Sequence, residues 1–329
     1  MTTPHPWHRS VFTLILPDAI RRQAHREILR RLAGEGFRIA YFELLDVRPE
    51  QLDALYDEQI TNAWSAYRYR LLDQLWALGP VAGLVLEDGS DAADPHARLK
   101  ALKGATDPGA AAPGTIRRDL RGINAMLSFM HAADRPEVSA REAAMLFSAA
   151  MPEAGPPRGD SGSGTAEDDA LAVLALGENA VPETRGFREV LTEHRSRVIR
   201  AAWRDLTPAG RAHAAATAGN RFATRVAVAA GDGFAAWAAA PVLQGVADPR
   251  SVSGGGLAEV GAGARIAEDI RGGPVHPAAA LLGAEWRPGL PALAERSLLR
   301  HCAALGVECD AWTRIVLLTS AYFAPNPES

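Results

Sequence analysis

Short apolar runs and amphipathic segments alternate along the first 150 residues of the chain. Three apolar runs, at residues 11–16, 37–45 and 81–86, are bounded by proline, glycine or charged positions, a pattern that predicts buried strands. Residues 19–34 carry isoleucine, leucine and alanine at helical spacing with arginines on the opposite side, which predicts an amphipathic helix. Further helices are predicted at residues 49–56, 64–78 and 95–103.

This alternation predicts an α+β domain over residues 1–150. The connections are compatible with a ferredoxin-like fold, in which split βαβ units form a mainly antiparallel sheet sandwich with helices. Residues 104–114 are rich in glycine, proline and alanine and have no regular period, so we expect a long loop there. Loops of that length inside a compact domain usually carry function.

The pattern changes beyond residue 150. Residues 151–178 are mostly glycine, proline, serine, alanine and acidic residues, and we expect them to form a flexible linker. Residues 179–329 are alanine-rich and periodic at helical spacing, so they predict a mostly α-helical domain whose function the sequence does not reveal. Amphipathic helices are expected at residues 187–206, 290–305 and 312–323. Tryptophans at helical positions are expected in the core of this domain: Trp203, Trp237, Trp286 and Trp312.

Bulk composition narrows the class of protein. Of 329 residues, 47% are apolar and 22% are charged, which is the balance of a soluble globular protein with two domains. The net charge of −4 gives no reason to expect nucleic acid or an anionic membrane as a partner. The polar N-terminus lacks a signal-peptide pattern and no apolar run approaches the roughly 20 residues of a membrane span, so we expect a cytoplasmic protein. Cys302 and Cys309 are expected to be buried thiols rather than a disulfide.

The two lysines of the chain lie close together in the sequence. Lys100 and Lys103 are the only lysines among 35 basic residues, and both precede the predicted loop. Lysine presents a compact charge that suits phosphate oxygens. Thr106 and Arg117 follow in or just after the loop, and His131 comes next. The grouping predicts a phosphate-binding site, although two lysines can also lie close together by chance.

Three short motifs occur in order along the first domain. Residues 16–18 read Leu-Pro-Asp at the end of the first predicted strand. Residues 104–108 and 113–119 read Gly-Ala-Thr-Asp-Pro and Pro-Gly-Thr-Ile-Arg-Arg-Asp, and residues 131–137 read His-Ala-Ala-Asp-Arg-Pro-Glu. Their order and spacing are similar to those of the motifs of nucleoside diphosphate kinases. Residues 9–147 therefore resemble that family, over a little under half of the chain.

The resemblance implies a phosphoryl transfer in two steps. His131 would take the γ-phosphoryl group from a nucleoside triphosphate and pass it to a nucleoside diphosphate or a related acceptor. Glu142 matches the family's glutamate that holds the other imidazole nitrogen by a hydrogen bond. Mg²⁺ would arrive with the nucleotide, and Asp134 would be an indirect partner of the ion. The resemblance assigns further contacts with the nucleotide or its phosphates to Lys100, Thr106, Arg117 and Tyr56.

The chain departs from the family pattern at several positions. Leu16 stands where the family has a lysine that touches the transferred group, and losing one such preorganised charge typically costs about 10² to 10³ in rate. Lys103, which the family pattern lacks, is a candidate to supply that charge. A few residues are inserted after Tyr56, near the family's base-stacking phenylalanine, and Tyr67 or Tyr69 is a candidate replacement. Other family residues, namely Gly, Arg, Asn and Ser, are replaced here by Met126, Leu127, Ser128 and Ala133.

Three functions remain open at this point. The leading hypothesis is a nucleoside diphosphate kinase-like phosphotransferase fused to a helical domain. The departures from the family pattern also allow a catalytically impaired nucleotide-binding sensor or scaffold. In a third hypothesis the helical domain carries the activity and the first domain only mediates assembly. Members of the family assemble as tetramers or hexamers, so the resemblance also implies a homo-oligomer.

Overall fold

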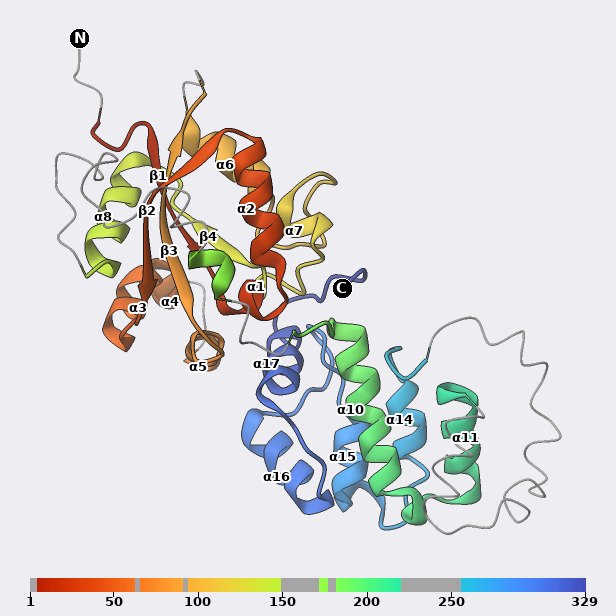
Figure 1. The fold of residues 1–329 in the computed structure, drawn as a ribbon. Coiled ribbons are helices and arrows are strands. Elements are labelled where there is room, and N and C mark those ends of the chain that lie inside the picture. Colours follow the sequence, from red (N-terminus) through yellow and green to blue (C-terminus); the bar gives the residue numbers. More distant parts are fainter. Residues whose placement is uncertain (1–4, 63–65, 91–93, 149–171, 177–181, 220–255) are drawn as a thin grey trace. The chain divides into compact units, whose positions relative to one another are not determined.

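The computed structural model contains two compact units (Figure 1). The first comprises Met1–Thr184 together with Pro325–Ser329, and the second comprises Arg185–Ala324. The end of the chain therefore belongs to the first unit, which differs from the predicted helical domain of residues 179–329, because Asn326 hydrogen-bonds to backbone of the first unit. The described residues are 5–62, 66–90, 94–148, 172–176, 182–219 and 256–329.

The first unit is built on a four-stranded antiparallel sheet with the strand order β2-β3-β1-β4. β1 (Ser10–Ile15) lies between β3 (Val81–Asp88) and β4 (Met130–Ala132), and β3 also pairs with β2 (Phe37–Leu45). All three pairings are antiparallel. β3 thus lies between β1 and β2, and β1 lies between β3 and β4, which is the split βαβ arrangement. The predicted α+β, ferredoxin-like sandwich is confirmed.

β4 is a strand that the sequence pattern did not predict. The other three strands were predicted, at nearly the same residues, as the apolar runs 11–16, 37–45 and 81–86. β4 has only three residues with a histidine in the middle, so it makes no recognisable run. Its pairing depends on β1, where Leu14 lies opposite His131, and such a partner is invisible in the local sequence.

Helices connect the strands of the first unit and flank the sheet (Figure 1). They are α1 (Pro17–Arg21), α2 (Ala24–Gly34), α3 (Pro49–Leu55), α4 (Asp57–Asn62), α5 (Ala66–Trp76), α6 (Pro95–Lys103), α7 (Ile116–Asp119) and α8 (Pro136–Leu146). The single helix predicted for residues 19–34 is divided at Gln23, whose φ of 57° is left-handed. The division changes the direction of the chain, so that Ile20 of α1 and Ile28 of α2 are both buried in one core.

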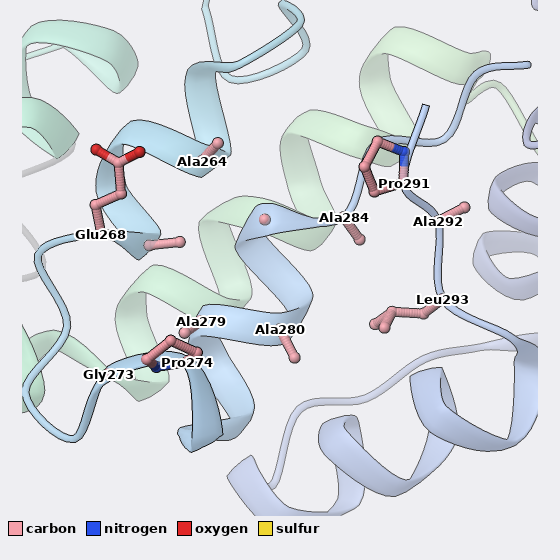
Figure 2. A pocket seen from close by; sticks show the side chains of 12 residues that line it. Ala264, Glu268, Gly273, Pro274, Ala279, Ala280, Ala284, Pro291, Ala292 and Leu293 are labelled. Atoms are coloured by element: carbon pink, nitrogen blue, oxygen red, sulfur yellow. The ribbon is translucent and has the colours of Figure 1, made fainter. Parts of the chain in front are cut away.

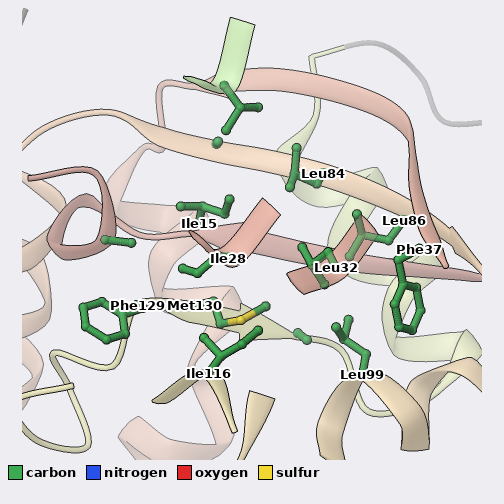
Figure 3. Packing of buried hydrophobic residues seen from close by; sticks show 14 of the residues in the cluster. Ile15, Ile28, Leu32, Phe37, Leu84, Leu86, Leu99, Ile116, Phe129 and Met130 are labelled. Carbon is green, nitrogen blue, oxygen red and sulfur yellow. The ribbon is translucent and has the colours of Figure 1, made fainter. Parts of the chain in front are cut away.

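Both faces of the sheet are covered. On one face, Ile15 of β1 packs in a cluster with Ile28 of α2 and Leu99 of α6 (Figure 3). On the other face, Phe12 of β1 contacts Phe147, the residue after α8, with ring centroids 5.4 Å apart in an edge arrangement. Successive residues of a strand point to opposite faces, so α2 and α6 cover one side and α8 covers the other.

Part of the predicted linker belongs to the core of the first unit. Within residues 151–178, the structure describes residues 172–176, and the rest of the linker lies outside the described residues. Val173 is fully buried in the same cluster as α2 and α6. The ring of His25 lies 3.4 Å from the backbone oxygen of Leu174. This short stretch is therefore packed in the core, because burial removes the apolar surface of Val173 from water.

The second unit is helical, as the sequence predicted. Its elements are α10 (Phe187–Ala201), the 3₁₀ helix η1 (Trp203–Asp205), α11 (Pro208–Ala218), α14 (Ala262–Ala267), the 3₁₀ helix η3 (Gly273–Val275), α15 (Pro277–Gly283), α16 (Glu295–Leu305) and α17 (Ala311–Ser320). α10 packs against α15, α16 and α17. Trp203, Trp286 and Trp312 are buried as predicted, and Trp237 lies outside the described residues.

All three helices predicted for this unit are shorter than the pattern indicated, and the last of them, α17, ends at Ser320 rather than at Phe323. The helix expected over residues 290–305 begins only at Glu295. Pro288 and Pro291 precede it, and proline lacks the N–H that helical turns require in their interior. The helix expected over 187–206 ends at Ala201. None of the helices in the described part of the chain is long and apolar enough to cross a membrane.

Candidate active site

His131 is the middle residue of β4, at one edge of the sheet. It lies opposite Leu14 of β1, and residues directly opposite in an antiparallel pair share a face. Its neighbours Met130 and Ala132 belong to the core cluster on the face covered by α2 and α6. His131 therefore faces α8, and its side chain is 26% exposed, so the ring can be reached from outside.

A buried glutamate holds the imidazole ring. Nε2 of His131 lies 2.8 Å from Oε2 of Glu142, a residue of α8 that is 3% exposed. A carboxylate can only accept a hydrogen bond, so Nε2 is the nitrogen that carries the proton. In the neutral ring, the lone pair then lies on Nδ1. The arrangement leaves Nδ1 as the nitrogen able to act as a nucleophile. The contact between His131 and Glu142 is the one that the sequence predicted.

The backbone bends sharply just before His131. Phe129 has a φ of 76°, a left-handed conformation that is unfavourable for a bulky residue. Two hydrogen bonds hold it, because its N–H donates to Oδ2 of Asp18 at 3.0 Å and its oxygen accepts from the N–H of Leu16 at 2.9 Å. Asp18 is 1% exposed, and burial raises its pKa to about 6. Leu16 and Asp18 of the Leu-Pro-Asp turn therefore hold the backbone that leads into His131 in this conformation.

Arg117 lies in the same region, and its guanidinium group is buried. Its Nη2 donates to the backbone oxygen of Met130 at 2.7 Å, and Nε and Nη1 donate to those of Ser128 and Gly104, each at 3.2 Å. Burial lowers its pKa to about 10. Three nitrogens are therefore used to join the start of the loop to β4. Any phosphate contact by Arg117 has to use its remaining N–H groups.

The two lysines differ in environment. Lys103 is 7% exposed, and its Nζ donates to the backbone oxygen of Ala132 at 3.5 Å. Burial lowers its pKa to about 8. Lys100 lies at the surface, where its Nζ is 3.2 Å from Oδ1 of the exposed Asp134. Thr106, on the loop that follows α6, is also exposed. Lys100, Asp134 and Thr106 are thus open to solvent, whereas Lys103 is enclosed.

The structure describes the side chain of Tyr56 but not those of the other candidate tyrosines, Tyr67 and Tyr69. Tyr56, at the end of α3, has its ring centroid 6.3 Å from that of His131, with an angle of 64° between the planes. Burial, and next the charge of Glu142, raise its pKa above the usual range. Tyr56 is therefore beside the imidazole ring. Tyr67 lies in α5, but its side chain is outside the described residues, so the prediction of a base contact there stays a prediction.

The residues that depart from the family pattern are buried. Leu16 is 4% exposed, and Ser128 and Ala133 are each 3% exposed. The side-chain oxygen of Asn124 accepts from the N–H groups of Met126 and Leu127, at 3.0 Å each, and so holds the turn that precedes β4. At these positions, where the resemblance implies polar or charged groups, the chain has small or apolar side chains that are buried.

Sequence reasoning missed two positioning residues. Asp18 was part of a recognised motif, but its role in holding Phe129 was not predicted. Thr13 of β1 donates from Oγ1 to the backbone oxygen of His131 and fixes the other side of the strand. A polar residue inside an apolar strand was the available signal for Thr13, and an aspartate directly after a strand was the signal for Asp18.

A separate pocket lies in the second unit. It has a volume of about 560 Å³ and is open to solvent between α14, α15 and the segment 291–293. Figure 2 shows Glu268 on one side and Pro291, Ala292 and Leu293 on the other. The remaining lining is mostly alanine and glycine. Glu268 is its sole ionisable residue among the described residues, so the pocket holds no group of catalytic residues comparable to that around His131.

Comparisons with known proteins concern the first unit. A family model described as nucleoside diphosphate kinase matches residues 9–151. A nucleoside diphosphate kinase of Metallosphaera sedula is 34% identical over 140 residues, which are 43% of this chain and 94% of that protein. The chain belongs to the nucleoside diphosphate kinase family. The resemblance predicted from the three motifs over residues 9–147 is thereby confirmed.

Two further comparisons concern the same part of the chain. A nucleoside diphosphate kinase of Moorella thermoacetica is 36% identical over 139 residues, which are 42% of this chain and 94% of that protein. Among solved structures, that of the Aquifex aeolicus nucleoside diphosphate kinase is 29% identical, with a TM-score of 0.37, and covers 43% of this chain and 95% of that chain. In this member of the nucleoside diphosphate kinase family, the matched residues lie in the first unit.

Proposed function

We propose that the first unit is a phosphotransferase of nucleoside diphosphate kinase type that works through a phosphohistidine. The observation that carries this proposal is the 2.8 Å hydrogen bond between Nε2 of His131 and Oε2 of Glu142, which leaves Nδ1 as the nucleophile. The partial exposure of the ring supports access by a substrate. Membership of the family supports nucleoside di- and triphosphates as the substrates.

The proposed reaction has two half-reactions. In the first, the lone pair of Nδ1 attacks the γ-phosphorus, an N–P bond forms, and the bond from phosphorus to the bridging oxygen breaks. The nucleoside diphosphate leaves with that electron pair. In the second, an oxygen of the acceptor's terminal phosphate attacks phosphorus, and the N–P bond breaks to return its electron pair to Nδ1. The Nε2 proton stays in its hydrogen bond, and the carboxylate of Glu142 stabilises the positive charge on the ring.

Phosphate binding in this proposal uses the groups at the end of α6 and on the loop after it. Lys100 and Thr106 are exposed and able to contact a nucleotide tail, and Arg117 holds the loop against β4. In the described part of the chain, no three His, Cys, Asp or Glu side chains form a group able to hold a metal ion. The exposed Asp134 is the residue that we assign to a water-mediated contact with Mg²⁺ that arrives with the nucleotide.

Labelling with γ-³²P-ATP tests the proposal. Wild-type protein is expected to acquire acid-labile, base-stable label, and His131→Ala is expected to acquire none. Glu142→Gln keeps an acceptor for Nε2 but removes the charge, so we expect its labelling rate to fall about tenfold to a hundredfold. Label on the wild type that is discharged by added GDP completes the cycle. Absence of label from the wild type, or equal label on His131→Ala, would contradict the proposal.

A second candidate function is a nucleotide sensor that binds without transfer. It is favoured by Leu16, which is 4% exposed and apolar where the resemblance predicts a lysine on the transferred group. Calorimetry with ATP and ADP distinguishes the two functions. Micromolar binding together with no phosphate exchange would support the sensor, whereas exchange at any rate that depends on His131 would support the transferase. Assembly into a homo-oligomer, a base contact by Tyr67 and a cytoplasmic location stay predictions from the sequence.

A further inference from the structure

Lys103 is a buried lysine with a single hydrogen bond among the described residues. It is the last residue of α6, and its Nζ donates to the oxygen of Ala132 across 3.5 Å, which is long for a hydrogen bond. An ammonium group has three N–H donors, and a buried charge is costly unless it is paired and hydrogen-bonded. The fold therefore encloses a cation whose bonding capacity is mostly unused, and an anionic ligand would fill it.

The position of this cation relates it directly to His131. β4 pairs with β1 along one edge, and its other edge faces away from the sheet. Along that outer edge, the oxygen of Met130 accepts from Arg117 and the oxygen of Ala132 accepts from Lys103. These two oxygens belong to the residues immediately before and after His131. Two cations thus bracket the residue that carries the nucleophile.

The resemblance implies a lysine at position 16 and none at position 103, and this chain has the reverse. Leu16 is buried where the resemblance predicts a lysine, and Lys103 is buried where the family pattern has none. The N–H of Leu16 bonds to the oxygen of Phe129, two residues before His131. Leu16 therefore adjoins the residue before β4, from the turn after β1, and Lys103 adjoins the last residue of β4, from the end of α6.

We propose that Lys103 contacts the terminal phosphate of the bound nucleotide and supplies the positive charge that Leu16 cannot. This inference rests on the proposed function, since it concerns the same nucleotide. It assigns the residue a direct contact with the transferred group. In this arrangement Lys103 contacts the phosphate from inside the fold, whereas Lys100 contacts it from the surface.

The charges around Lys103 agree with this role. Arg117 and Lys100 act on it as like charges and lower its pKa, and Asp134 and Glu142 act as opposite charges and raise it. Burial has the largest effect and sets the pKa at about 8. A phosphate group brings negative charge close to the ammonium and raises that pKa again. Nucleotide binding above pH 8 is therefore expected to take up a proton.

A purely structural role for Lys103 predicts different behaviour. If the lysine only holds the oxygen of Ala132, its replacement changes stability and affects ligands with one or three phosphates equally. If it contacts the terminal phosphate, its replacement selectively weakens the triphosphate. Arginine at the same position keeps its charge at pH 8 to 9, because even the buried Arg117 has a pKa of about 10. The ratio of ATP affinity to AMP affinity, and its pH dependence, separate the two roles.

The experiment uses the full chain and three variants, Lys103→Met, Lys103→Arg and Lys103→Met combined with Leu16→Lys. For Lys103→Met we expect histidine labelling to slow about a hundredfold and the ATP-to-AMP affinity ratio to fall about tenfold. Leu16→Lys is expected to restore at least tenfold in labelling. Lys103→Arg is expected to keep the ratio above pH 8, where the wild type loses it. Arg38→Met, which removes an exposed charge paired with Glu87 on β2 and β3, is the matched control.

Each outcome decides between the two proposals. If the wild type is labelled and Lys103→Met is labelled equally fast with the same affinity ratio, the role of Lys103 is wrong and the phosphotransferase stands. If the wild type is never labelled but Lys103→Met still lowers the ATP-to-AMP ratio, the phosphate contact stands and transfer is wrong. If the wild type binds no ATP by calorimetry, both are wrong. Should Lys103→Met fail to fold, Lys103→Arg still tests the pH dependence.

Discussion

At the scale of single residues, the candidate site depends on groups that are both ionisable and buried. Asp18, Arg117 and Glu142 are each no more than 5% exposed, and each hydrogen-bonds to β4, to the residue before it or to the ring of His131. Burial shifts the pKa of Asp18 up and that of Arg117 down, toward the neutral form in each case. Asp18 and Arg117 therefore link the geometry of the site to pH.

The pKa of Asp18 predicts how stability changes with pH. Its folded pKa of about 6 lies above its unfolded value of 3.8, so between these values the folded state binds more protons. The stabilisation is fully present below pH 3.8 and is lost as the pH rises through 6. In Asp18→Asn this dependence disappears, so the free energy of unfolding of the wild type relative to the variant should decrease by on the order of 1–3 kcal/mol between pH 4 and pH 7.

Urea unfolding at pH 4, 5, 6 and 7 measures this difference. The asparagine side chain keeps an oxygen that can accept from the N–H of Phe129, so the fold should be retained. Glu50→Gln, a substitution at an exposed residue in the first turn of α3, serves as the control and should show no such dependence. A constant difference between the wild type and Asp18→Asn over this pH range would show that the carboxyl group titrates normally.

At the scale of elements, the site lies on a short edge strand and a loop that the end of the chain helps to hold. Asn326 is 1% exposed, its N–H donates to the oxygen of Ile123 at 2.6 Å, and its Nδ2 donates to the oxygen of Gly122 at 3.0 Å. Glu328 forms an ion pair of 2.5 Å with Arg118, which follows Arg117 in α7. The tail thereby supports the segment between the loop and β4.

Replacing Asn326 with alanine is expected to loosen this segment. The buried oxygen of Gly122 loses its partner, which should lower the free energy of unfolding by about 1–3 kcal/mol. Hydrogen exchange at residues 104–123 should become faster than in the wild type, and faster than elsewhere in the first unit. Glu328→Gln, which removes only a surface ion pair, should change stability by less than about 0.5 kcal/mol. Unchanged hydrogen exchange in Asn326→Ala would mean that residues 325–329 do not stabilise this segment.

At the scale of the whole molecule, the chain forms two compact units, and the candidate active site belongs to the first. The second unit contains a buried ion pair of its own, in which Nη2 of Arg195 lies 2.9 Å from Oε1 of Glu285. Arg195 also donates to backbone oxygens of Leu257, Glu259 and Ala284. One guanidinium group of α10 thus joins the segment before α14 to the segment after α15.

Breaking this ion pair should affect only the second unit. Arg195→Met leaves Glu285 buried without its partner, which typically costs about 3–5 kcal/mol. Calorimetric unfolding should show two transitions, of which only one moves to lower temperature in the variant. ATP affinity should stay at the wild-type value, because the proposed phosphate contacts all lie in the first unit. Adding Glu285→Gln should recover part of the loss, and a shift of both transitions would indicate that the units unfold together.

Much of the candidate site could be predicted from the order of three motifs. The histidine and its glutamate were predicted as a pair, and their side chains are in contact. The role of Arg117 was predicted only as a phosphate contact, whereas its nitrogens also hold backbone oxygens of β4 and the loop. A motif records which residue type recurs at a position, but it does not record how many of its donors the backbone already uses.

The three long strands, most of the helices and the family can be predicted from the amino-acid sequence, because periodicity and motif order are local properties that do not depend on which segments pack together. Three features became visible in the folded chain alone: Met130–Ala132 is a strand, Lys103 is enclosed beside it, and Pro325–Ser329 belongs to the first unit. Each of these depends on contacts between residues far apart in the chain. Burial and pairing of that kind arise from the whole fold, and no local pattern of side chains specifies them.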